Sequence, residues 1–299
     1  MRSACSAAGL EKHPRPVLLA GDASTLERLA TAIEARPDLG PVAPFWLAIY
    51  RVQIAAREEL AAARPAPEWT VRRERLQQGL PQLEVDDLPL ESGPVEALIG
   101  RLAEAWRQHD PTCQAAGQGD WVARVRRAFA DPALAFGQQR QLDWNDALAA
   151  LALGPYLEWA AGAIAPRLPE GTGAWGRGWC PVCGGLPDLA LLVGEPAARS
   201  LVCSRCNTAW AYHRVSCPYC DDTDRQMYHA GDDDRYRLYV CGSCRRYLKT
   251  IEVRHPADGL DPRVERLITI GMDLAALEAG YGPEARDDLP RVVKDRQEA

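Results

Sequence analysis

The sequence predicts a multidomain α+β protein with an all-α N-terminal domain, two small four-cysteine β modules and a C-terminal helix. Three observations predict this class. Residues 1–165 are rich in Ala, Leu and Arg, with apolar residues at helical spacing. The composition changes at the glycine-rich stretch GTGAWGRG, residues 171–178. Four Cys-x-x-Cys pairs, separated by short β-like segments, follow that stretch.

The expected boundaries follow these changes. They are a helical domain over 1–170, a first ribbon over 175–212, a second ribbon over 213–255, and a C-terminal helix over 260–282 with a frayed tail to 299.

Helix signals recur along the N-terminal domain. Ser24 and Glu27 have capping-box spacing, which predicts a helix that runs to Ala35. Pro94 is expected at the start of a helix that ends near His109. Asp131 is expected to be an N-cap followed by proline. The other predicted helices cover residues 45–63, 71–80, 121–130 and 144–165.

Short β-like runs lie between the cysteine pairs, at residues 188–193, 200–203, 208–214, 235–241 and 247–253. One further helix is expected from Asp261, at its N-cap, to Gly280.

The cysteine spacing is the most specific signal in the chain. The pairs are Cys180/Cys183, Cys203/Cys206, Cys217/Cys220 and Cys241/Cys244. They form C-x2-C-x19-C-x2-C and then C-x2-C-x20-C-x2-C. Two cysteines three residues apart on a tight turn can direct both sulfurs at one ion, and two such turns complete a tetrahedral thiolate site. The sequence therefore predicts two metal sites, each built from four consecutive cysteines.

Three other arrangements of these cysteines compete with that prediction. Four disulfides are disfavoured in a cytosolic chain. A thioredoxin-like catalytic pair lacks the surrounding βαβ pattern. In an interleaved arrangement, each site would combine an outer with an inner Cys-x-x-Cys turn along the sequence. In the sequential arrangement, each site combines two consecutive turns and closes over its own hairpin of about twenty residues.

The metal is zinc or iron on this pattern, because both accept four thiolates in a tetrahedron. Zinc would only stabilise the fold, whereas iron would form a one-electron centre of the rubredoxin type. The Cys-Pro-Val-Cys-Gly turn at 180–184 is close to the rubredoxin turn, and the other three pairs lack the trailing glycine.

Residues outside the eight cysteines are expected to have other roles. His213 is expected to have a packing or edge role rather than to bind metal, and His229 and His255 are not needed as ligands. The acidic run 232–234 is expected to form a solvated turn. The isolated Cys5 and Cys113 have no neighbouring base or ligand in the sequence.

Charge and motifs exclude several classes of protein. The net charge is −6, and residues 174–255 hold 11 basic against 9 acidic residues, which argues against a nucleic-acid binder. The longest apolar run, 147–153, is too short to cross a bilayer, and no secretory segment is evident, so we expect a cytoplasmic protein without membrane insertion. Phosphate-loop, zinc-protease and hydrolase motifs are absent from the sequence, and no catalytic residue is predicted.

The cysteine region resembles the formate dehydrogenase accessory proteins of the FdhE type. The resemblance is carried by WCPVCGGLP (179–187), VCSRC (202–206) with Trp210, HRVSCPYC (213–220), YVCGSCRRYLKT (239–250) and DLAALEAGYGP (273–283). It is detailed over residues 175–283 and architectural over the first 170.

That resemblance implies a cytoplasmic assembly factor, not an enzyme, that binds the catalytic subunit of respiratory formate dehydrogenase before export. It also implies that the eight paired cysteines hold two metal ions, with iron favoured over zinc. It specifies no oligomeric state and no client-binding surface. The alternatives are a rubredoxin-like electron-transfer protein and a zinc-ribbon nucleic-acid-binding protein.

Overall fold

The structure is a computed structural model of the 299-residue chain. It describes residues 16–19, 21–40, 42–65, 68–113, 119–131, 143–169, 175–193, 198–223, 225–229, 235–253 and 260–282. The predicted Asp131–Pro132 cap, the acidic run 232–234, Cys5 and His255 lie wholly or partly outside these ranges. So does the side chain of His229.

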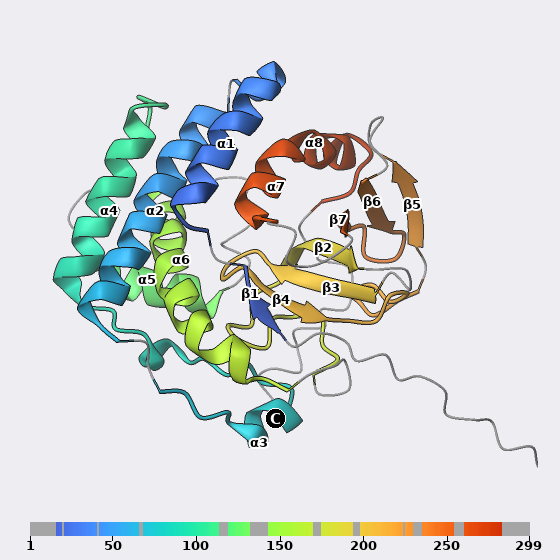
Figure 1. Ribbon diagram of the computed structural model, residues 1–299, viewed down its shortest axis with the longest axis horizontal. Helices are drawn as coiled ribbons and strands as arrows, with labels where there is room; N and C mark the ends of the chain where they lie inside the picture. Colours follow the sequence, from blue (N-terminus) through green and yellow to red (C-terminus); the bar gives the residue numbers. More distant parts are fainter. Residues whose placement is uncertain are drawn as a thin grey trace, which may run out of the picture.

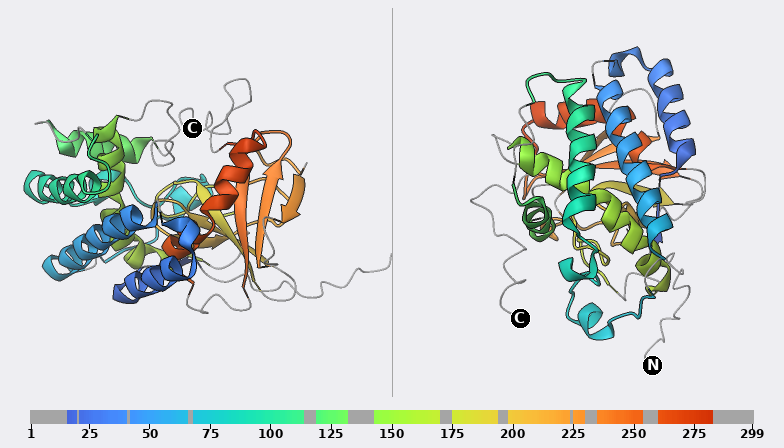
Figure 2. Two further views of the ribbon diagram at one scale, coloured as in Figure 1. Left: turned by 90° about the horizontal axis from the view of Figure 1, so that it is seen from above. Right: turned by 90° about the vertical axis from the view of Figure 1, so that its left-hand side faces the viewer.

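A layer of helices lies beside one mixed β-sheet (Figure 1). The helices of the layer are α1 (Ala23–Ala35), α2 (Ala43–Ala63), α4 (Ser92–Arg107), α5 (Trp121–Ala130) and α6 (Trp144–Ile164), and the short α3 (Arg73–Gln77) lies in the connection between α2 and α4. This confirms the predicted all-α N-terminal part, and the side view in Figure 2 separates it from the strands.

The long helix α6 is the centre of this layer and is buried along most of its length. Pro155 inside it cannot donate the backbone hydrogen bond that would normally reach the carbonyl of Leu151. The side-chain amide of Gln53 on α2 donates to that carbonyl instead, at 2.8 Å. The proline therefore creates a polar contact between two core helices.

Helix α6 and its short 3-10 extension also meet a simple test for a membrane span. Among the described residues, the stretch Trp144–Arg167 alone is long and apolar enough to cross a bilayer. However, 78% of its apolar window is buried inside the protein, as expected for a core helix.

The sheet has seven strands in the order β1-β4-β3-β2-β7-β6-β5. They are β1 (Val17–Leu18), β2 (Pro187–Val193), β3 (Ala198–Cys203), β4 (Thr208–Ala211), β5 (Arg225–His229), β6 (Tyr236–Cys241) and β7 (Tyr247–Val253). Strands β2, β3 and β4 belong to the first predicted ribbon, and β5, β6 and β7 to the second. Parallel pairing of β2 with β7 joins the two ribbons into one sheet, with Leu189 opposite Lys249.

Three details differ from the sequence-based expectation. Helix α1 is capped by Asp22 rather than Ser24, because the Asp22 amide donates to Thr25 Oγ1 at 2.9 Å and the Thr25 hydroxyl in turn donates to Asp261. The predicted C-terminal helix is two helices, α7 (Pro262–Ile268) and α8 (Ile270–Glu278), separated at Thr269. Strands β1 and β5 were not predicted.

Gly178 lies where the entry to the first ribbon touches the second. A Cβ atom at this position would lie 1.8 Å from the carbonyl oxygen of Pro218, which is backbone and cannot rotate away. We expect Gly178→Ala to displace the ribbons from each other and to lower the thermal unfolding midpoint by several degrees.

The control for that measurement is Gly100→Ala. A Cβ at Gly100, on α4, meets nothing within 4 Å. That change is expected to be neutral or to raise stability by roughly 0.5–1 kcal/mol, because alanine is the better helix former. Equal midpoints for the two variants would contradict the close approach at Gly178.

Candidate metal centres

Two four-cysteine clusters lie at the ends of strands and in the adjoining turns, and each contains four consecutive paired cysteines of the sequence. Within each cluster the four Sγ atoms lie within 4.8 Å of one another. The first cluster is Cys180, Cys183, Cys203 and Cys206; the second is Cys217, Cys220, Cys241 and Cys244. The structure thus has the sequential grouping and not the interleaved one.

Each cluster joins two turns across a hairpin. In the first, a turn that precedes β2 carries Cys180 and Cys183, whereas Cys203 ends β3 and Cys206 lies in the turn before β4. In the second, Cys241 ends β6 and Cys244 lies in the turn before β7.

All four turns share one backbone geometry. The residue after the second cysteine has a positive φ in each turn: 73° at Gly184, 55° at Asn207, 60° at Asp221 and 56° at Arg245. Its amide donates to the carbonyl of the first cysteine, at 2.8 to 3.2 Å in the four turns. Glycine is therefore not required there, because Asn and Asp tolerate the left-handed region and Arg245 is held in it by other contacts.

The sulfur positions fit one tetrahedral ion per cluster. A metal–thiolate bond of about 2.3 Å implies sulfur atoms roughly 3.8 Å apart at the corners of a tetrahedron. Sulfur atoms within hydrogen-bonding distance of each other are 3.5 to 3.6 Å apart in the first cluster and 3.7 Å apart in the second. These distances exceed the ~2.05 Å of a disulfide, and the cysteines of both clusters are free thiols.

Electrostatics within each cluster favour a cation. Burial raises the pKa of Cys180, whereas hydrogen bonds from the neighbouring cysteines lower the pKa of Cys183. In the second cluster the hydrogen bond from Cys244 lowers the pKa of Cys217 to about 5, and burial raises that of Cys220 to about 12. The sulfurs therefore compete for a few protons, and a divalent cation would replace those protons and neutralise the thiolates.

The first cluster is embedded in the main core. All four of its cysteines are buried, and they belong to the same apolar cluster as residues of α2, α4, α5 and α6. The helical part also holds the first turn directly, because the amides of Gln82 and Leu83 donate to the carbonyls of Pro181 and Val182, each at 2.9 Å.

The second cluster lies at the edge of the core. Its sulfurs form a small apolar cluster of their own with Tyr219, and Cys220 is partly exposed. The segment that follows α8 holds this site, because the Arg245 guanidinium lies 4.0 Å from the ring centre of Tyr281 and donates to the carbonyl of Gly280.

Several residues other than the eight paired cysteines bear on the site. His213 is exposed after β4, contacts Tyr212 and is not part of either cluster. Cys113 is a buried free thiol in the helical part, away from both clusters. Sequence analysis missed Arg205 and Tyr219, which lie inside Cys-x-x-Cys turns. Their position between paired cysteines was the signal available for them.

The comparisons with known proteins agree with this architecture. A protein from Aquifex aeolicus described as a FdhE homolog is 32% identical over 114 residues, which is 36% of this chain and 40% of that protein. A Pseudomonas aeruginosa FdhE homolog is 25% identical over 288 residues, 85% of each chain. The crystal structure of the FdhE protein from Pseudomonas aeruginosa matches 90% of this chain and 95% of that one, with a TM-score of 0.56 and 23% identity, which supports the fold.

No family model matches the chain. The match to the Aquifex protein spans about two-fifths of that relative, whereas the Pseudomonas match includes the helical part as well as both ribbons. The chain is therefore similar in sequence to proteins described as FdhE homologs, and it shares with the FdhE crystal structure the fold in which its paired four-cysteine ribbons lie beside a helical layer.

Proposed function

We propose that this protein is a cytoplasmic accessory factor that binds the catalytic subunit of a formate dehydrogenase and supports its maturation before export. It acts by binding, without catalysing a reaction. The observation that carries the proposal is the pair of four-cysteine ribbons fused to a helical layer, within a chain that is similar to proteins described as FdhE homologs. Each ribbon contacts the rest of the fold through polar and aromatic side chains, which supports a rigid binding surface.

Direct binding tests the proposal. The purified chain is immobilised and titrated with the formate dehydrogenase catalytic subunit from the same organism, expressed without its export signal. Saturable binding at 0.15 M salt is expected. Binding of an unrelated exported oxidoreductase with the same affinity would contradict it.

The same binding assay, with DNA or RNA as the titrant, tests the alternative that the protein binds nucleic acid. Binding to DNA or RNA that falls steeply between 50 and 200 mM salt would favour that function, because phosphate contacts are lost as salt rises. The acidic net charge of −6 predicts no such binding.

We further propose that the eight cysteines bind two ions and that iron is the natural metal, with zinc as the alternative. Four thiolates suit both. Protein purified without oxygen is expected to contain two iron atoms per chain and to show a red colour on oxidation that a reductant removes. Two zinc atoms in a colourless sample would contradict iron.

Electron transfer is the second candidate function, and the partial exposure of Cys220 favours it at the second site. Reduction and reoxidation of that site by a partner at a useful rate would support this candidate. A reducible site that leaves formate dehydrogenase maturation unchanged when it is replaced would leave binding as the function.

A further inference from the structure

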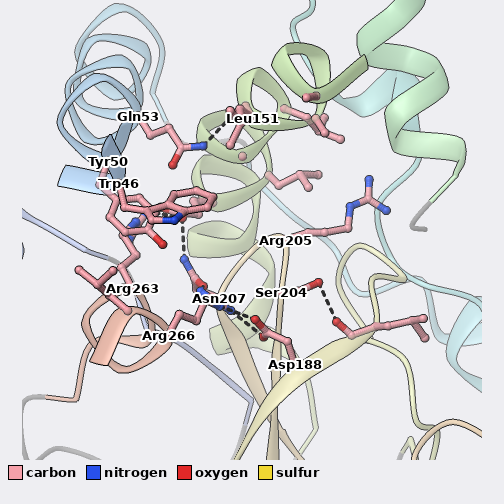
Figure 3. A pocket seen from close by; sticks show the side chains of 18 of the residues that line it. Trp46, Tyr50, Gln53, Leu151, Asp188, Ser204, Arg205, Asn207, Arg263 and Arg266 are labelled. Atoms are coloured by element: carbon pink, nitrogen blue, oxygen red, sulfur yellow. Dashed lines mark hydrogen bonds and ion pairs between the residues drawn. The ribbon is translucent and has the colours of Figure 1, made fainter. Parts of the chain in front are cut away.

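A cavity of about 540 Å³ lies between the helical layer, the turns of the ribbons and helices α7 and α8. We call it the interlayer cavity. Its volume is within the range of pockets that enclose a small molecule. Trp46 and Tyr50 of α2 line one side, Leu151 of α6 lines another, and Arg205 lies on the side formed by the first ribbon (Figure 3). Tyr219 of the second ribbon also lines the cavity.

Most charged groups of the cavity wall already have a charged partner. Arg266 binds both carboxylate oxygens of Asp188, at 2.5 and 2.9 Å. Lys249 lies 2.7 Å from Asp273, and Arg263 pairs with Glu158. These pairs make the wall polar but nearly neutral, so they leave little net charge for a ligand.

Arg205 is the exception in the described wall. Its side chain extends from the β3–β4 turn toward α5, where Nη2 donates to the carbonyls of Ala128 and Phe129 at 3.3 and 3.1 Å. Nη1 is buried without a hydrogen-bond partner among the described residues, and the residue is 7% exposed. A buried guanidinium with a free donor and no carboxylate partner is costly, and it attracts an anion.

The thiolates of the first metal centre offer a competing explanation for Arg205. Its backbone amide donates to Cys203 Sγ at 3.4 Å, and its positive charge contributes to lowering the pKa of Cys183, so Arg205 also compensates the sulfurs. That role requires a positive charge but not the planar fork of a guanidinium. Replacement by lysine therefore separates the two roles.

An exposed apolar stripe leads away from the cavity along α8. Ile270 and Asp273 line the cavity, and Leu274 and Leu277 continue the same helix face at i+4 and i+7 from Ile270. Leu274 is 58% exposed and Leu277 is 52% exposed, and they are two of the four large apolar residues that stand out on the described surface. The stripe runs for roughly 10 Å, which is more than a small ligand held in the cavity would contact.

We propose that the interlayer cavity and the α8 stripe together bind a polypeptide segment of the client, which places one apolar side chain in the cavity and a neighbouring carboxylate on Arg205. The unpaired donor of Arg205 would bind the carboxylate, and the aromatic wall of the cavity would contact the apolar side chain. The leucines of α8 would contact the flanking part of the client segment. This inference rests on the proposed function for the identity of the client, whereas the chemistry of the site stands on the cavity itself.

Two sets of variants test the inference. Ala150→Phe fills the cavity from α6, and Arg205→Lys keeps the charge but removes the fork. The double variant Leu274→Glu/Leu277→Glu alters only the stripe. The controls are Ala61→Phe and Ala62→Glu, which make the same kinds of change on the exposed end of α2. Circular dichroism and metal content establish that each variant is folded and loaded.

The first readout uses 8-anilinonaphthalene-1-sulfonate, an aromatic body with one anionic group, and needs no client. The unmodified protein is expected to bind one equivalent. Ala150→Phe and Arg205→Lys should weaken that binding at least about tenfold, and the two controls should not. Equal binding by all variants would overturn the cavity as a site for apolar anions.

The second readout is the affinity for the formate dehydrogenase catalytic subunit. Ala150→Phe and the double leucine variant are each expected to raise Kd at least about tenfold, as for central contacts of an interface. Unchanged client affinity in variants that no longer bind the dye would overturn the client segment as the occupant. Failure of the unmodified protein to bind the client, with the dye result as expected, would instead overturn the proposed function.

Discussion

Replacement of Cys180 by serine is expected to unfold most of the protein, whereas Cys241→Ser is expected to disturb only the second ribbon. Cys180 is fully buried in the core that the first cluster shares with the helical layer. Cys241 belongs to a separate small cluster at the edge. Metal binding by a structural thiolate site contributes about 10 kcal/mol or more, which is comparable with the whole stability of a typical domain.

Helical circular dichroism, thermal unfolding and metal content per chain measure the difference. For Cys180→Ser we expect loss of the helical signal at 37 °C and of the cooperative transition. For Cys241→Ser we expect a nearly intact helical signal and one metal ion per chain instead of two. Cys113→Ser is the matched control, because Cys113 is also buried and lies outside both clusters.

Two results would contradict this asymmetry. Equal loss of helix in the two variants would show that the second ribbon also supports the helical layer. Two metal ions per chain in either variant would show that the replaced cysteine is not a ligand.

The second large effect is expected at Glu158, a carboxylate that is 4% exposed near the middle of the molecule. It lies on α6, accepts a hydrogen bond from Asn207 Nδ2 at 2.7 Å, and pairs with Arg263 of α7. One side chain thus connects the helical layer, the first ribbon and the C-terminal helices. Glu158→Ala would leave the buried Arg263 guanidinium without its partner.

We expect Glu158→Ala to cost about 3–5 kcal/mol of unfolding free energy, because a buried charge is left uncompensated. Urea unfolding at constant metal loading measures the loss. The control is Glu59→Ala, which removes an exposed ion pair with Arg101 and is expected to cost less than about 1 kcal/mol. A loss at Glu158 no larger than that at Glu59 would contradict the connecting role.

A double replacement refines that test. Glu158→Leu with Arg263→Met removes both charges together and fills part of the space with apolar atoms. Its stability should lie well above that of Glu158→Ala, because neither charge then remains buried alone.

The eight cysteines and their grouping could be predicted from the sequence because the information is local. A Cys-x-x-Cys turn is short enough to form by itself, and a span of about twenty residues matches one hairpin. The segments 188–193 and 247–253 were predicted within one residue for the same reason. Their high content of apolar residues is a property of each segment alone.

Features that depend on distant partners could not be predicted in this way. The parallel pairing of β2 with β7 leaves no trace in either segment alone. The cap at Asp22 was missed because Thr25 is fixed by Asp261, 236 residues away. The interlayer cavity is lined by residues of the helices, the ribbon turns and the C-terminal segment, so no single sequence motif predicts it.

The pairing of β1 with β4 has a consequence for synthesis of the protein. Val17 lies opposite Ala209, so the edge strand β1 waits for a partner that is made 192 residues later. At 5–20 residues per second, that delay is about 10 to 40 s. During this time the helices already made lack the first ribbon, which supplies part of their shared core. Among the strands of the described sheet, β1 is therefore synthesised before its neighbours and is among the last to reach its native place.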